Sequence, residues 1–581
     1  MKTLAEFQQA YAAGGDTQEI LRRVWETIRD EPDKGIFITK AGWDDILKQL
    51  REAPVDGKLF GIPYAVKDNI DVAGMPTTAA CPDYSYLPEE SATAVKLLQA
   101  AGAICFGKTN LDQFATGLVG VRTPYPVPKN AFDEKYLPGG SSCGSAIAVA
   151  KELVPFSLGT DTAGSGRVPA AFNELIGLKP TRGFVSTRGV VDACKSLDCI
   201  SVFANSCADA DAVLGVTAKL DCEEAWSRTP PHQWKRFGEG FRFGIPRPKD
   251  LQYFGWDDAG KLFEAAKQAF VELGGEAVEV DIQPFLAAAR LLYEGPWVAE
   301  RYVGIKDFLA TNPDSVFPVT REIIEKGEFP KASELFEAKY KLAECKRLAD
   351  REMAGLDFVM LPTVPRNFTL EEVSEEPVKL NSVLGTYTNF MNLLDYSALA
   401  LPAGRYQQKL PWGVTLFAEP AADRALLELG ARYERRIGRE VPEISDVNFD
   451  AIEIVVCGAH LEGMSLNWQL TERGGRLVSK GRTADCYRMY LIPEGNRLPE
   501  RPALIRVNED GVQIAVEVWS LGIKQFGDFV SKIPAPLGVG KVLLADGREK
   551  CGFIAEPRAT IGARDLSEFG GWAGYLNSIR P

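Results

Sequence analysis

The sequence predicts an α/β protein whose main domain has a mostly parallel or mixed β-sheet, followed by a small β-rich domain. Helical segments alternate with short apolar strands through most of the chain. From about residue 452, short β-like runs follow one another at close intervals, separated by turn residues. The chain of 581 residues is also too long for one ordinary core, which favours at least two domains.

The helix–strand alternation is clearest in three segments. Residues 91–110 predict a helix that Ser91 caps and Gly102 ends, followed by a short apolar strand. Residues 144–161 repeat the pattern with a helix of small residues and a strand that ends in GTD. A third helix over 260–273 leads into the strand GGEAVEVDI. Such an order is typical of an α/β sheet with helices packed on it.

The change of pattern near residue 452 predicts the domain boundary. We expect a main domain over residues 1–440, a linker over the polar stretch VPEISDVNFD at 441–450, and a C-terminal domain over 451–581. The C-terminal runs include IEIVVCGA, YRMYLIP and GVQIAVEVWSL, which are rich in β-branched and aromatic residues.

The composition is that of a globular protein, with 45% hydrophobic and 25% charged residues. A net charge of −13 argues against a nucleic-acid partner, although one buried arginine can still attract a small anionic substrate. The eleven scattered cysteines include no C-x-x-C pair, which indicates reduced thiols in the cytosol. No apolar run resembles a signal peptide or a membrane span, so we expect a cytoplasmic protein that does not enter a membrane.

Three motifs carry residues suited to nucleophilic catalysis: GIPYAVKDNID (61–71), PGGSSCGSA (138–146) and GTDTAGSGRVPAA (159–171). Lys67 ends an apolar strand, and Ser165 follows one. Glycine-rich turns allow backbone N–H groups to converge on a developing oxyanion. A serine hydroxyl needs a base, and a lysine can serve if burial keeps its amine neutral.

Other interpretations of these motifs are simpler. A lone Gly/Ser-rich loop is more often a turn or a phosphate cradle, and a lone lysine such as Lys67 is by default at the surface. Ser142 lies in a G-x-S-x-G string, as in an α/β-hydrolase elbow, but that elbow needs a histidine in the same domain and His460 lies in the other predicted one. The chain has no P-loop motif, and its two histidines suggest no metal cluster. We expect no metal and no organic cofactor.

Together the three motifs and their spacing resemble the amidase signature family, over residues 20–435. The resemblance implies a central mixed β-sheet surrounded by helices. It also implies a Ser-Ser-Lys triad in which Ser165 is the nucleophile and Lys67 the base. Ser141 would bridge the two, and in this family it follows a cis peptide bond that does not involve proline.

The same resemblance assigns supporting roles around the nucleophile. The backbone N–H groups expected to form the oxyanion hole are those of Thr162, Ala163, Gly164 and Ser165. Ser142 and Asp161 are expected to support the loop.

Two further segments, AGSGRVPAAFNELIGLKPT and LLYEGPWVAERY, resemble the allophanate hydrolase subfamily. The resemblance implies that Tyr293 and Arg301 hold the substrate, and a planar two-pronged guanidinium suits the carboxylate of allophanate. Spacing alone favours a surface ion pair of Arg301 with Glu294 or Glu300, and it is the resemblance that favours the substrate-binding role. The implied reaction is release of ammonia from allophanate through an acyl-enzyme.

The segment CGAHLEGMSLNWQLTERGGR at 457–476 resembles the additional C-terminal domain of allophanate hydrolases. The later runs GVQIAVEVWSLG and GVGKVLLADG resemble a γ-glutamylcyclotransferase-like β fold. The resemblance implies that His460 acts in decarboxylation of the N-carboxycarbamate product, giving two ammonia and two carbon dioxide overall. A structural histidine in a domain that only forms a dimer is the alternative.

Two other functions remain open at this stage. One is an amidase of the same fold acting on biuret, malonamate or an aryl amide. The other is a glutaminase-type component of an amidotransferase complex, although such a component has no evident need for the C-terminal domain. We expect a small-molecule substrate and a homodimer. The sequence does not indicate which pathway supplies the substrate.

Overall fold

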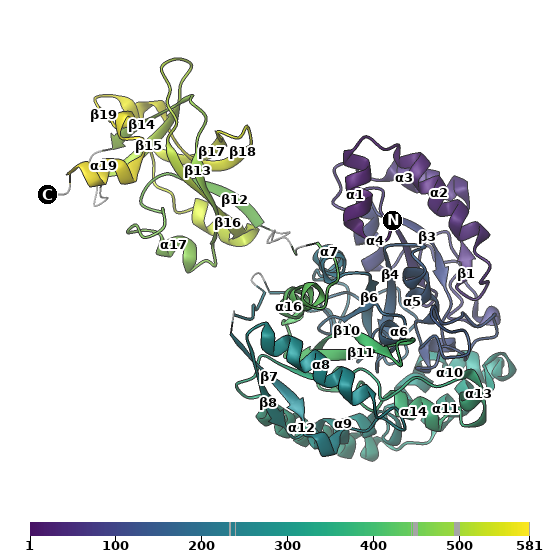
Figure 1. Ribbon diagram of the computed structural model, residues 1–581. Coiled ribbons are helices and arrows are strands. Elements are labelled where there is room, and N and C mark those ends of the chain that lie inside the picture. Colours follow the sequence, from purple (N-terminus) through teal and green to yellow (C-terminus); the bar gives the residue numbers. More distant parts are fainter. Residues whose placement is uncertain (232–233, 239, 443, 445–450, 493–499, 580–581) are drawn as a thin grey trace. The chain divides into compact units, whose positions relative to one another are not determined.

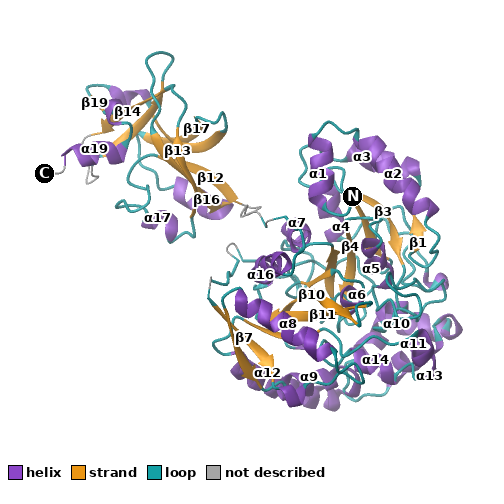
Figure 2. Cartoon of the chain, viewed as in Figure 1, coloured by secondary structure: helices purple, strands orange, loops and turns teal. Residues whose placement is uncertain are grey.

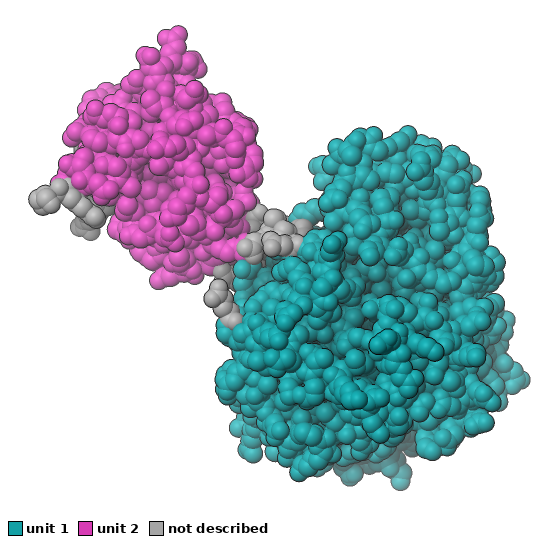
Figure 3. Space-filling model, in the orientation of Figure 1, with its two compact units in different colours: residues 1–445 teal, residues 446–581 magenta. Residues whose placement is uncertain are grey.

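The computed structural model describes the whole chain except residues 232–233, 239, 443, 445–450, 493–499 and 580–581. It divides into two compact units, residues 1–445 and 446–581, which Figure 3 distinguishes by colour. Most of the predicted linker at 441–450 lies outside the described residues.

The described part of the first unit contains an eleven-stranded sheet (Figure 1). Its strands are β1 (Phe37–Lys40), β2 (Pro63–Lys67), β3 (Ile104–Thr109), β4 (Phe156–Asp161), β5 (Ile176–Lys179), β6 (Cys199–Ala204), β7 (Phe241–Pro246), β8 (Gly275–Val280), β9 (Phe358–Pro362), β10 (Ser397–Tyr406) and β11 (Leu410–Ala418). Their order is β1-β3-β2-β4-β6-β5-β10-β11-β9-β7-β8.

The sheet is mixed. Strand β2 runs parallel to β3 and β4, and β7 runs parallel to β8 and β9. Between these groups, β6, β5, β10 and β11 pair antiparallel with their neighbours. The prediction of an α/β domain with a mixed sheet is confirmed.

Helices surround the strands of this unit in Figure 2. They are α1 (Leu4–Ala12), α2 (Thr17–Asp30), α3 (Trp43–Glu52), α4 (Thr93–Ala100), α5 (Cys143–Ala150), α6 (Val168–Phe172), α7 (Cys207–Thr217), α8 (Ala259–Glu272), α9 (Gln283–Glu294), α10 (Val298–Thr311), α11 (Pro318–Glu325), α12 (Ala332–Met353), α13 (Leu370–Glu375), α14 (Lys379–Leu384), α15 (Phe390–Leu393) and α16 (Asp423–Arg436). No helix in the described residues is both long enough and apolar enough to cross a membrane.

The three predicted helix–strand units are present as α4–β3, α5–β4 and α8–β8. One detail of the first was wrong. Ser91 does not cap α4, because the helix begins two residues later with Ala92 in the N-cap position. The Ser91 hydroxyl instead accepts a hydrogen bond of 2.9 Å from the backbone N–H of Ala73, so a contact distant in sequence replaces the local cap.

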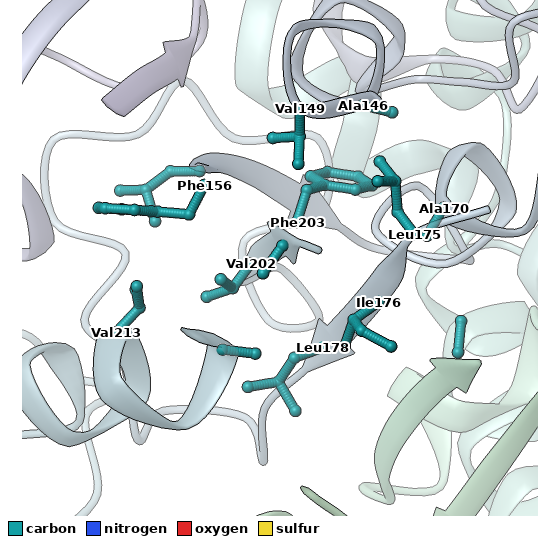
Figure 4. Close-up of a cluster of buried hydrophobic side chains, with 14 of the residues drawn as sticks. Ala146, Val149, Phe156, Ala170, Leu175, Ile176, Leu178, Val202, Phe203 and Val213 are labelled. Atoms are coloured by element: carbon teal, nitrogen blue, oxygen red, sulfur yellow. The ribbon is translucent and has the colours of Figure 1, made fainter. Parts of the chain in front are cut away.

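Buried apolar side chains cover both faces of the sheet centre. In Figure 4, Phe203 of β6 points toward Ala146 and Val149 of α5, and its neighbour Val202 lies on the side of Val213 of α7. Adjacent strand residues point to opposite faces, so β6 is buried from both sides. Strands β2 and β4 are also fully buried, which holds the loops that follow them in place.

The second unit contains two sheets in its described residues, a five-stranded one in the order β13-β16-β12-β18-β17 and a three-stranded one in the order β15-β14-β19. Its elements are β12 (Ala451–Val456), α17 (Trp468–Thr471), β13 (Arg476–Arg482), β14 (Tyr487–Ile492), β15 (Arg501–Arg506), β16 (Ala515–Gly522), α18 (Ile523–Val530), β17 (Leu537–Leu543), β18 (Glu549–Ala555), β19 (Arg564–Asp565) and α19 (Trp572–Ile579). The predicted β-rich character is confirmed.

Candidate active site

Lys67 is the last residue of β2, and its side chain is completely buried. Its Nζ donates hydrogen bonds to Ser141 Oγ at 2.8 Å and to Thr160 Oγ1 at 2.7 Å. Burial lowers the pKa of this amine from 10.5 to about 7, because the charged form loses its hydration and no carboxylate is in direct contact to compensate. Lys67 is therefore available as a neutral amine near neutral pH.

Ser141 lies just before α5, in the glycine- and serine-rich motif PGGSSCGSA at 138–146. The peptide bond between Gly140 and Ser141 is cis, as the family resemblance implied. A side chain at position 140 would collide with the carboxylate of Asp112. The next residue, Ser142, donates its hydroxyl to the carbonyl of Thr160 at 3.1 Å and so links the start of α5 to the end of β4.

Ser165 lies in the loop that follows β4. Its hydroxyl donates a long hydrogen bond of 3.5 Å to the carbonyl of Gly117, and it is not hydrogen-bonded to Ser141 in this structure. The loop is held by a fully buried ion pair, in which Asp161 accepts two hydrogen bonds of 2.9 Å from Arg167. Burial acts to raise the pKa of Asp161, but the charge and hydrogen bonds of Arg167, the charge of Lys179 and the N–H of Gly166 together outweigh it and lower the pKa below its usual value.

The backbone N–H groups near Ser165 differ in their availability. The N–H of Gly164 donates to Oδ1 of Asp161 at 2.9 Å. Those of Thr162, Ala163 and Ser165 have no hydrogen-bond partner among the described residues. Gly164 has a φ of +143°, and a side chain there would collide with the side chain of Thr388, so only glycine fits. Three unpaired N–H groups on one buried turn can bind an oxyanion.

Tyr293 near the end of α9 and Arg301 in α10 are brought together. Arg301 is 4% exposed, and its Nη2 donates to the Tyr293 hydroxyl at 3.4 Å. Its Nη1 donates to Thr116 Oγ1 at 3.2 Å and to the carbonyl of Ala115 at 3.4 Å. It forms no ion pair with any described carboxylate, so the alternative of a surface ion pair with Glu294 or Glu300 does not describe it.

His460 lies in the loop after β12, in the second unit. Its Nε2 is 3.0 Å from Oε1 of Gln469. The imidazole stacks on Phe553 at 5.2 Å between ring centroids and meets the edge of Phe529 at 5.1 Å. Burial lowers the pKa of His460 from its ordinary value of 6.5, although the contact with Gln469 opposes this shift. The ring is therefore neutral at neutral pH.

Several residues of the site were missed at the sequence level. Thr160 contacts Lys67, Gly117 accepts from Ser165, and Asp198 accepts the hydroxyl of Thr162 and the N–H of Ala193. Thr160 could have been suspected, since it is a polar residue one position before the end of a fully buried strand in the signature motif. The others come from segments with no distinctive spacing. Among the described residues no cluster of three or more His, Cys, Asp or Glu side chains could hold a metal ion.

Comparisons with known proteins agree with this geometry. The model of the family described as Amidase matches residues 38–427, and the model described as Allophanate hydrolase C-terminal domain matches residues 452–577. A urea amidolyase of Lachancea kluyveri is 44% identical over 90% of this chain, and the chain spans only 30% of that relative's length.

A solved allophanate hydrolase of Kluyveromyces lactis is 39% identical, with a TM-score of 0.76, and each chain covers at least 99% of the other. One component of the glutamyl-tRNA(Gln) amidotransferase of Streptococcus pneumoniae is 34% identical over 72% of this chain and 93% of its own. The first unit thus has the fold, the signature motifs and the relatives of one family. The chain belongs to the amidase family and is an amidohydrolase.

Proposed function

We propose that this protein hydrolyses allophanate, with Ser165 attacking the carbonyl of the terminal amide. The observation that carries the proposal is Arg301, a buried guanidinium that forms no ion pair with a described carboxylate. An unpaired buried charge costs on the order of several kcal/mol. The binding of an anion offsets that cost, and the carboxylate of allophanate is such an anion.

The hydrogen bonds of Arg301 leave some of its N–H groups available to donate to this ligand. All three are long, at 3.2 to 3.4 Å, and they occupy both hydrogens of Nη1 but only one of Nη2. The Nε–H and one N–H of Nη2 remain without a partner among the described residues. Two donors on adjacent guanidinium nitrogens form the fork that binds a carboxylate in two places. Tyr293 adds its hydroxyl beside that fork.

The triad supplies the proton relay. A neutral Lys67 amine keeps one lone pair, so its 2.8 Å hydrogen bond with Ser141 can reverse, with the hydroxyl donating. Ser141 can then accept the proton of Ser165 as the nucleophile attacks. Because the contact of Ser165 with the Gly117 carbonyl is 3.5 Å long, little is lost when the hydroxyl turns toward Ser141.

The chemistry then follows the usual order for acyl transfer. The N–H groups of Thr162, Ala163 and Ser165 bind the oxyanion, and Gly164 could join only by releasing Asp161. The proton held by Lys67 returns to the leaving nitrogen, and ammonia departs. Water then attacks the acyl-enzyme with the same relay and releases N-carboxycarbamate. This product loses one carbon dioxide to give carbamate, and carbamate breaks down to ammonia and a second carbon dioxide, so that two ammonia and two carbon dioxide form overall.

The second unit is proposed to assist the decarboxylation through His460. Its ring lies against Phe529, Phe553 and Gln469. Because burial lowers the pKa of His460 and favours the neutral ring, the ring would first take up a proton and then donate it to the nitrogen that carries the leaving carboxylate. The match of residues 452–577 to the allophanate hydrolase C-terminal domain supports a shared reaction for the two units. A domain that serves only assembly is the alternative.

One assay separates this function from its rivals. Purified protein is offered allophanate, biuret, malonamate and glutamine at equal concentration, and the initial rate of ammonia release is measured. Allophanate should exceed biuret, which differs by a neutral amide in place of the carboxylate. Glutamine hydrolysis above that of allophanate would instead support the role of the amidotransferase relative, which matches 72% of this chain.

Two other properties remain proposals. A homodimer is expected, and light scattering on the purified chain measures its mass. A cytosolic compartment is favoured by the eleven cysteines, all of which are unpaired in the structure.

A further inference from the structure

Residues 114–117, here called the 114–117 segment, connect the two ends of the proposed site. Its Gly117 carbonyl accepts from Ser165, while the Thr116 hydroxyl and the Ala115 carbonyl accept from Arg301. The acceptors for the nucleophile and for the proposed carboxylate-binding arginine are thus adjacent in the chain. The placement of Arg301 relative to Ser165 therefore depends on this short segment.

Thr116 is the most constrained residue of the segment. Its N–H donates to the Gln113 carbonyl at 3.1 Å, and its hydroxyl donates to the Phe114 carbonyl at 3.1 Å. The same hydroxyl oxygen accepts from Arg301, and its carbonyl accepts from Nη1 of Arg122 at 2.9 Å. Every polar group of Thr116 has a partner, and the residue is 1% exposed. Its hydroxyl therefore has one available orientation.

The backbone of the segment is strained. Phe114 and Ala115 both have left-handed conformations, with φ of +50° and +52°. Two successive left-handed residues other than glycine persist only where the surroundings hold them. This backbone brings the Ala115 carbonyl and the Thr116 hydroxyl to the same guanidinium nitrogen of Arg301.

Arg122 holds the segment from the other side. It is 2% exposed, its Nη2 donates to the Pro377 carbonyl at 2.8 Å, and its Nε is buried without a hydrogen-bond partner. Thus two buried guanidinium groups meet at Thr116, one at its carbonyl and one at its hydroxyl. Because like charges repel, fixed acceptors between them are needed to keep Arg301 in one place.

We propose that Thr116 is a positioning residue that sets specificity for carboxylate-bearing amides by fixing Arg301 at a defined distance from Ser165. The inference rests on the proposed function, since it assigns the carboxylate to Arg301. It adds a residue that does not touch the reacting atoms and acts through the arginine.

Three variants test the role. Thr116→Val keeps the shape but removes the hydroxyl, and Thr116→Ser keeps the hydroxyl. The matched control is Thr363→Val, because Thr363 is also completely buried and its hydroxyl is hydrogen-bonded to that of Thr415 at 2.9 Å, not to a residue of the proposed triad or to Arg301. Steady-state kinetics on allophanate and on biuret are measured for each variant, with thermal denaturation to verify folding.

Thr116→Val should raise KM for allophanate at least tenfold and change kcat by less than threefold, because Ser165 and Lys67 are untouched. The kcat/KM ratio of allophanate to biuret should fall by a similar factor. Thr116→Ser and Thr363→Val should both stay within threefold of the parent. An unchanged KM in Thr116→Val, or a Thr116→Ser as impaired as the valine variant, would overturn the proposal.

A double-mutant cycle with Arg301→Met separates action through the arginine from a general structural effect. In the Arg301→Met background, Thr116→Val should change KM by less than twofold, whereas independent effects would multiply. If the KM changes of Thr116→Val and Arg301→Met multiply in the double variant, the role of Thr116 is refuted. It is also refuted if Thr116→Ser does not fold like the parent. If the parent itself releases no ammonia from allophanate, the proposed function fails. If the parent is active and Thr116→Val resembles it, only the role of Thr116 fails.

Discussion

The titration of Lys67 gives the most direct test of the proposed relay. With its pKa lowered to about 7 by burial, roughly half of the amine is neutral at pH 7. At the ordinary lysine pKa of about 10.4, fewer than about one molecule in a thousand would have a neutral amine at pH 7. The base is the neutral form, so kcat/KM should rise with pH, change about tenfold per unit well below pH 7, and level off above pH 8.

The assay is the initial rate of ammonia release from allophanate between pH 5.5 and 9, at substrate concentrations far below KM. Another buried group also titrates in this range, because burial raises the pKa of Asp209 in α7 to about 7. Asp209→Asn is therefore the matched control, and it should leave the midpoint in place. Lys67→Arg should be inactive at every pH, because its guanidinium stays charged. A rate that is flat or falls with rising pH would refute the relay, as would a midpoint that disappears in Asp209→Asn.

Four further outcomes are expected. Ser165→Ala should abolish ammonia release without loss of folding, as measured by circular dichroism and initial rates, and more than a few per cent of residual activity would contradict the assignment. Ser141→Ala should keep a measurable residual rate, since water can replace the bridging hydroxyl imperfectly. Arg301→Lys should lower kcat/KM for allophanate at least tenfold, about 1.4 kcal/mol, with a smaller loss on a neutral amide. In His460→Ala, carbon dioxide release should lag behind ammonia release; simultaneous release, as in the parent, would indicate a structural histidine.

The parts of the fold that were predictable are those encoded locally. The units α4–β3 and α8–β8 each contain a periodic apolar pattern and a glycine soon after the helix, and α5–β4 is a run of small residues followed by a short apolar strand, so each segment alone specifies its unit. The order of the eleven strands was not predictable, since β10 and β11 enter the sheet centre by pairings between residues far apart in sequence. The incorrect cap at Ser91 has the same cause, because its partner Ala73 lies outside the local segment.

The candidate site divides in the same way. Lys67, Ser141 and Ser165 lie in motifs whose residue types and spacing could be compared with a family. Thr116 and Arg122 lie in ATGLVGVR, where no pattern distinguishes a residue that holds an arginine from an ordinary loop residue. The importance of Thr116 depends on its contact with Arg301, which lies 185 residues further along the chain. The importance of Arg122 depends in turn on its contact with Thr116.

The neutrality of Lys67 depends on its surroundings as well as on burial. Asp112, Asp161 and Asp198 all act to raise its pKa, yet burial prevails. Each carboxylate is engaged elsewhere: Asp161 binds Arg167, while Asp112 and Asp198 accept backbone N–H groups.

Those partners stabilise the carboxylates without placing any of them against the lysine amine, whose hydrogen bonds go to two hydroxyl groups. A direct lysine–carboxylate pair would favour the charged form and remove the base. The ion pair between Asp161 and Arg167 thus serves the relay as well as the loop, because it holds the Asp161 carboxylate out of direct contact with Lys67, so that its negative charge raises the pKa of the amine less than burial lowers it.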